Sequence, residues 1–84
     1  MDKNHIIMVL DLQKRGEQHD IEVPLHLTVN ELFSALNEGF HLNIDSRDIT
    51  QYYLSTENPI ALLKGNKKIS DYGLRNGTII HFSR

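Results

Sequence analysis

Residues 27–40, LTVNELFSALNEGF, carry the clearest structural signal in the chain, that of an amphipathic helix with its own start sequence. Thr28 and Glu31 form a capping box, because each side chain can bond the backbone N–H of the other residue. Apolar residues follow at helical spacing and make one stripe, which comprises Val29, Leu32, Phe33, Leu36 and Phe40. We predict one helix that buries this stripe and ends between Glu38 and Leu42.

Two strands are expected before this helix. Residues 5–12, HIIMVLDL, are short, apolar and rich in β-formers, although their length alone leaves strand and helix open. Residues 13–19 are polar and contain Gly16, which indicates a hairpin loop. Residues 20–23, DIEV, alternate polar and apolar as a half-buried strand does. The next residue, Pro24, cannot donate to a ladder, so this strand lies at an edge or ends there.

Three further strands are expected after the helix, at residues 50–55, 60–63 and 78–82. Turns are expected between them, at residues 57–59, 70–74 and 76–77. Ile44 is the expected core anchor of the polar connection that follows the helix. The element order predicts an α+β fold, with a mixed sheet covered on one face by one helix. The length of 84 residues allows one domain, 1–84.

Composition excludes several classes of function. The net charge is −2 and the Lys and Arg residues are scattered, so we expect no nucleic-acid partner. No segment approaches the roughly 20 apolar residues of a membrane span, and the first residues, MDKNH, do not resemble a secretory signal. The absence of cysteine fits a reducing compartment. We expect a soluble, cytoplasmic protein.

Residues with chemical potential form no catalytic or metal-binding pattern. No His-x-His or His-x-x-x-His pair occurs among the five histidines, His5, His19, His26, His41 and His81. The carboxylate pairs Asp20/Glu22 and Asp45/Asp48 have no predicted pocket to separate their pKa values. Neither a nucleophile elbow nor a phosphate-binding loop is present. We therefore expect no enzyme activity, no cofactor and no metal.

The last part of the chain carries a resemblance to a known superfamily. Residues 69–82, ISDYGLRNGTIIHF, are similar to the end of ubiquitin, where a Ser-Asp-Tyr turn precedes the closing strand. The resemblance implies a β-grasp (ubiquitin-like) fold, in which the Tyr72 hydroxyl contacts a backbone loop. It also implies the strand order of that fold, with the first strand between the second and the last.

Several short stretches resemble the YukD/EsaB family, the ubiquitin-like proteins of bacterial type VII (WXG-type) secretion systems. They are residues 10–12, 20–24, 32–33, 71–74 and 76–77. The resemblance implies a non-conjugated accessory or regulatory component that binds other proteins, and its partners are expected among the secretion machinery. Ubiquitin and the sulfur carriers end in Gly-Gly, whereas Ser83-Arg84 follows the last strand here, so we expect no conjugation chemistry.

Two alternatives to the secretion role stay open. One is a ubiquitin-like modifier or sulfur carrier, which the intact mass of the native chain would test. The other is a generic β-grasp scaffold domain, which genomic context would separate from a secretion component. Self-association as a homodimer, and peripheral membrane location through a protein partner, are also open.

The strand alternation predicts an apolar patch on the open face of the sheet. If the even-numbered residues of the first strand face the helix, Ile7 and Val9 point away from it. The same alternation places Tyr53, Ile79 and His81 on the open side. A contiguous apolar patch exposed to water is a candidate protein-binding surface. Alternatively, Lys and Arg stems cover an ordinary apolar strand, or a bulge inverts the assignment.

Overall fold

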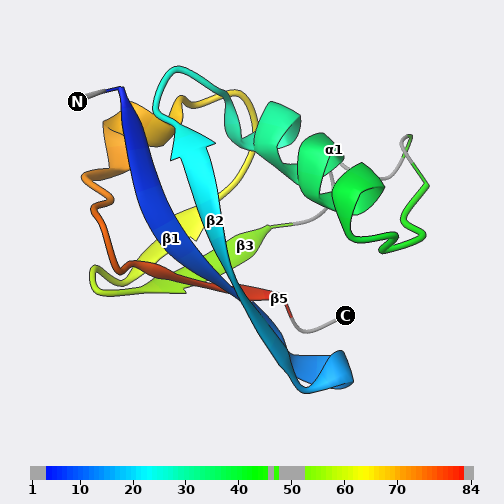
Figure 1. Cartoon of the computed structure of the whole chain (residues 1–84). Coiled ribbons are helices and arrows are strands. Elements are labelled where there is room, and N and C mark those ends of the chain that lie inside the picture. Colours follow the sequence, from blue (N-terminus) through cyan, green and yellow to red (C-terminus); the bar gives the residue numbers. More distant parts are fainter. Residues whose placement is uncertain (1–3, 46, 48–52, 83–84) are drawn as a thin grey trace.

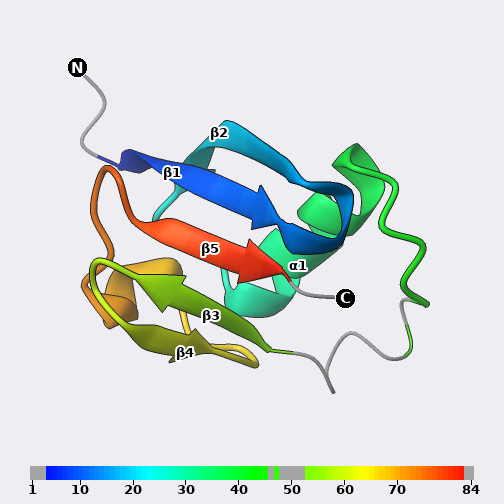
Figure 2. The same ribbon diagram turned by 90° about the horizontal axis from the view of Figure 1, so that it is seen from below.

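The computed structural model describes residues 4–45, 47 and 53–82. In chain order the elements are β1 (His5–Leu12), η1 (Gln13–Arg15), β2 (Glu17–Pro24), α1 (Val29–Gly39), β3 (Leu54–Glu57), β4 (Ala61–Leu63), η3 (Ile69–Tyr72) and β5 (Ile79–Phe82). The strands form a sheet of order β2-β1-β5-β3-β4. Figure 1 and Figure 2 show α1 lying across one face of this sheet. The predicted α+β architecture is confirmed.

The centre of the sheet joins the first strand to the last. β1 and β5 run parallel with Val9 opposite Ile79, and β2 and β3 pair antiparallel on either side. Before β5 begins, the Gly77 N–H donates to the Ile7 carbonyl at 2.9 Å. The Ile7 N–H donates in turn to Asn76 Oδ1 at 2.8 Å. Gly77 has a φ of 91°, a left-handed conformation that suits glycine, so this turn can approach β1.

The core lies between the sheet and α1. The even-numbered residues of β1 are buried, as the alternation predicts, and so are Ile80 and Phe82 of β5. The Phe33 ring on α1 meets the Phe82 ring edge-on, with 5.8 Å between centroids. Ile44 is also buried, which confirms it as the anchor of the segment after the helix. The buried hydrophobic residues are Ile6, Met8, Leu10, Leu12, Val23, Val29, Leu32, Phe33, Leu36, Ile44, Leu54, Leu63, Ile69, Leu74, Ile80 and Phe82.

Both ends of α1 are fixed by side chains. The predicted capping box is present, with the Glu31 N–H donating to the Thr28 hydroxyl at 3.1 Å and the Thr28 N–H donating to Glu31 Oε1 at 3.0 Å. The hydrogen bond from the Thr28 backbone N–H lowers the pKa of the Glu31 carboxyl below its ordinary value. Beyond the other end, the Arg15 guanidinium donates to the carbonyls of Phe40 and His41, at 2.7 and 2.8 Å.

Tyr72 has the role that the resemblance to ubiquitin implies. Its hydroxyl lies 3.3 Å from the carbonyl oxygen and 3.4 Å from the backbone nitrogen of Lys64. The phenol therefore holds the chain that leaves β4 against the η3 turn.

Some element bounds differ from those predicted. β2 begins at Glu17 rather than Asp20, because the left-handed residue Gly16 reverses the chain tightly enough for Glu17 to pair with Leu12. β3 extends to Glu57, where the sequence predicts a turn, because Glu57 pairs with Ile79. The first part of the predicted strand at 50–55 lies outside the described residues.

Candidate functional site

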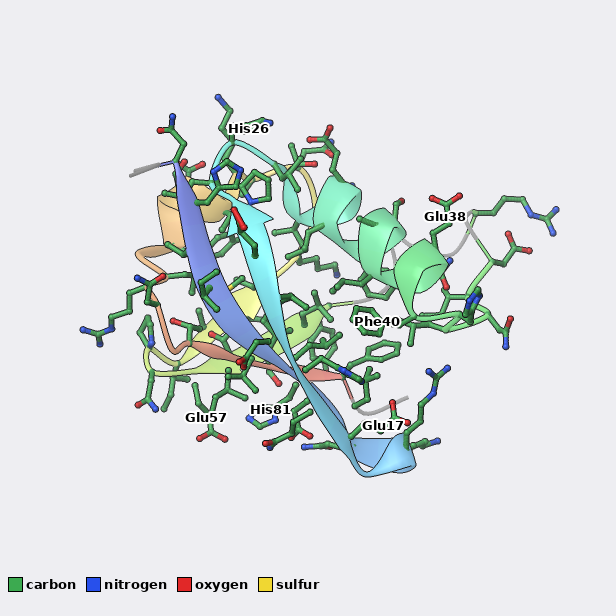
Figure 3. The ribbon with its side chains drawn as sticks, in the orientation of Figure 1. Glu17, His26, Glu38, Phe40, Glu57 and His81 are labelled. Atoms are coloured by element: carbon green, nitrogen blue, oxygen red, sulfur yellow. The ribbon has the colours of Figure 1, made fainter. Side chains whose placement is uncertain are left out.

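The candidate site is the side of the sheet opposite α1, which we call the outer face. Residues paired across neighbouring strands share a face, so the register arranges the outer face in rows. The first row is Gln18, Asp11, His81, Ser55 and Leu62. The second row is Asp20, Val9, Ile79 and Glu57, and the third is Glu22 and Ile7. Figure 3 shows Glu57 and His81 projecting from the sheet on the side away from α1.

An apolar centre occupies the middle of the outer face. It consists of Ile7, Val9 and Ile79, which lie on the adjacent strands β1 and β5. Val9 pairs directly with Ile79, and Ile7 follows on the same side of β1. Ile7 is 45% exposed, while Val9 and Ile79 are partly buried. The structure therefore brings together these three predicted residues.

Tyr53 does not adjoin this centre. Glu57, the last residue of β3, pairs with Ile79, and Ser55 pairs with His81. Tyr53 directly precedes β3, so it lies at the opposite end of this strand from Glu57 and Ile79. Its side chain is 60% exposed. Leu62 on β4 is 57% exposed and belongs to the row of Ser55. Leu62 is absent from the residues predicted for the site, although its alternation with the buried Leu63 indicates an outward position.

His81 lies between two carboxylates on neighbouring strands. Its Nδ1 lies 3.0 Å from Asp11 Oδ2 on β1, and its Nε2 lies 2.6 Å from Glu57 Oε1 on β3. The His81 and Asp11 side chains are each about four-fifths buried, whereas Glu57 is more than half exposed. This array borders the apolar centre, so His81 contributes to the rim of the site rather than to an apolar patch.

Acidic residues frame the apolar centre. Asp20 and Glu22 on β2 are exposed and pair with Val9 and Ile7 respectively. In the three rows defined above, four residues are acidic and none is Lys or Arg. The alternative that basic stems cover the apolar strand is therefore not supported within these rows.

Residues 4–45, 47 and 53–82 contain no group of three or more His, Cys, Asp or Glu side chains placed to hold a metal ion. In the same residues, no helix combines the length and the apolar character needed to cross a membrane. The outer face combines an apolar centre with acidic residues around it.

The strand order and the helix across one face define a ubiquitin-like β-grasp protein. The chain belongs to the family described as WXG100 protein secretion system (Wss), protein YukD, whose sequence profile matches residues 5–82. This confirms the family resemblance seen in the sequence and makes the chain a ubiquitin-like member of that secretion-system family. No curated protein sequence is significantly similar to it.

Solved structures share the fold at low sequence identity. The C-terminal ubiquitin-like domain of mouse tubulin-specific chaperone e has a TM-score of 0.71 and 12% identity, covering 96% of this chain and 87% of that chain. The UBL domain of Plasmodium falciparum Dsk2 has a TM-score of 0.64 and 18% identity, covering 92% and 93%. The UBL domain of yeast Ddi1 has a TM-score of 0.63 and 15% identity, covering 95% and 91%. These similarities establish the fold alone.

Proposed function

We propose that this protein is a non-conjugated accessory component of the WXG100 secretion system that works by docking on another component of the machinery. The single observation that carries the proposal is the unpartnered apolar centre, Ile7, Val9 and Ile79, on the outer face of a YukD-family chain. An apolar cluster exposed on a sheet is a typical protein-binding surface. The protein acts in the cytoplasm and reaches the membrane only through its partner.

The charge pattern favours a different partner over a second copy of the same chain. Two outer faces stacked on one another would oppose the carboxylates of Asp11, Asp20, Glu22 and Glu57 with the same set. Juxtaposed like charges cost free energy at an interface. The proposal therefore assigns the outer face to a heterologous contact.

A pull-down from the native cytoplasmic and membrane fractions tests this function. Ile7→Lys places a charge in the apolar centre, and Ala35→Lys adds the same charge at an exposed position of α1. Circular dichroism and thermal melting confirm that each variant is folded. We expect secretion-system components with wild type and Ala35→Lys, and their loss with Ile7→Lys.

The other outcomes are equally informative. Equal recovery with Ile7→Lys would show that docking uses a different surface. If wild type recovers no secretion-system component, the accessory role itself is wrong.

A further inference from the structure

We infer that the segment docking on the outer face is a cationic amphipathic α-helix, with an apolar stripe bordered on both sides by Lys or Arg. This inference rests on the proposed function, because it specifies the chemistry of the partner at the same site. It is carried by the order of residues across the four strands β2, β1, β5 and β3. There the row reads Asp20, Val9, Ile79, Glu57, with a carboxylate at each end and two apolar residues between.

The dimensions of this row fit a helix. Neighbouring strands lie about 4.8 Å apart, so three strand spacings separate Asp20 from Glu57 by about 14 Å. A helix with its side chains is about 10–12 Å across. Its apolar stripe can therefore cover Val9 and Ile79, while long basic side chains on either border reach the two carboxylates.

Two further carboxylates, those of Glu22 on β2 and Asp11 on β1, lie beside this row along the strand direction. Glu22 lies on the β2 side next to Ile7. Asp11 lies two residues beyond Val9, where it contacts His81. A helix aligned with β1 and β5 thus meets acidic groups along its length as well as at both borders.

The charge distribution also argues against other occupants. Anionic lipid headgroups and nucleic-acid phosphates would be repelled by four carboxylates without a Lys or Arg in the same rows. The whole chain has 11 acidic and nine basic residues, whereas the three rows of the outer face contain four acidic residues and neither Lys nor Arg. A basic partner would recognise one side of the protein.

The probe is a fluorescent synthetic peptide of about 18 residues, long enough to form a helix. Leucines at helical spacing make its stripe, and lysines occupy both borders. One control peptide has the same composition in scrambled order, and a second replaces every lysine with glutamate. Fluorescence anisotropy gives the Kd for each peptide with wild-type protein and variants.

Two double variants carry the same change of net charge. Asp20→Asn/Glu57→Gln removes the carboxylates at the two ends of the row. Glu17→Gln/Glu38→Gln is the matched control, because Glu17 pairs with the buried Leu12 and Glu38 lies on α1. Because it loses two exposed ion pairs with the peptide, the first variant should bind the lysine peptide about fivefold more weakly. The control variant should bind it like wild type.

The outcomes separate this inference from the proposed function. Equal binding of the scrambled peptide would overturn the helical geometry, and equal loss in both double variants would overturn the assignment to this face. Failure of the lysine peptide to bind, or binding no tighter than that of the glutamate peptide, would overturn the cationic chemistry. Each of these results leaves the pull-down of secretion components as an independent test of function.

Discussion

The Thr78 hydroxyl donates a 2.7 Å hydrogen bond to the backbone carbonyl of Asn58, 20 residues earlier in the chain. The same oxygen accepts a 3.1 Å hydrogen bond from the Arg75 N–H. Thr78 is fully buried. One threonine therefore connects the turn between β3 and β4 to the turn that leads into β5.

Thr78→Val should destabilise the protein by about 1–3 kcal/mol, because valine keeps the volume but leaves the Asn58 carbonyl and the Arg75 N–H without this partner. Urea unfolding at neutral pH measures the change. Ser55→Ala, at an exposed position of β3, is the control and should change the free energy of unfolding by less than about 0.5 kcal/mol. Similar values for the two variants would contradict a structural role for the Thr78 hydroxyl.

The same substitution on neighbouring strands should distinguish the two faces of the sheet. Ile80→Thr places a hydroxyl in the core and should cost about 2–3 kcal/mol. Ile7→Thr keeps a β-branched side chain at a half-exposed site and should cost less than about 1 kcal/mol. Urea unfolding of both variants is the measurement. A large loss of stability in Ile7→Thr would show that the apolar centre serves the fold rather than a partner.

Asp11 and His81 should be energetically coupled. Removing the charge with Asp11→Asn and the imidazole with His81→Gln, singly and together, gives a double-mutant cycle. A coupling free energy of about 0.5–1 kcal/mol is expected for this partly buried contact. Strictly additive effects would show that the 3.0 Å approach of the two side chains contributes nothing to stability.

The helix cap should make stability depend on pH through Glu31. Its pKa is lowered in the folded state, chiefly by the hydrogen bond from the Thr28 backbone N–H. The folded state therefore holds the carboxylate more readily than the unfolded chain does. The resulting stabilisation is complete above the ordinary glutamate pKa and is lost as the pH falls through the lower folded value.

Thermal melting of wild type and Glu31→Gln across this acidic range measures the effect. Wild type should melt at a higher temperature than the variant near neutral pH, and the gap should narrow as the solution is acidified. Glu38→Gln, on the exposed side of the same helix, should show no such narrowing. A constant gap for Glu31→Gln would mean that the charge of the carboxylate does not contribute to the cap.

Much of the fold could be predicted from local sequence. The capping box and apolar stripe located α1, since a helix start depends on residues within one turn of each other. Strand alternation correctly separated buried from outward residues on β1 and β5. The start of β2 was predicted too late because the tight reversal at Gly16 extends pairing to polar residues that carry no strand signal.

The sequence does not predict those features of the site that depend on the register between distant strands. Ile7, Val9 and Ile79 were grouped correctly, because alternation and strand order suffice for them. Tyr53 was grouped with them, although the pairing of Ser55 with His81 places it at the other end of β3. The array of Asp11, His81 and Glu57 was missed for the same reason, since three strands must be aligned before these side chains meet.

Because β1 pairs with β5, the outer face is complete only after β5 has been synthesised. Asp11 and His81 lie 70 residues apart in the chain yet in adjacent strands. Until β5 has been synthesised, β1 has only β2 beside it, and the apolar centre lacks Ile79. Contacts of such long range form late in folding. A partner that contacts both Val9 and Ile79 therefore binds fully folded molecules in preference to nascent or truncated ones.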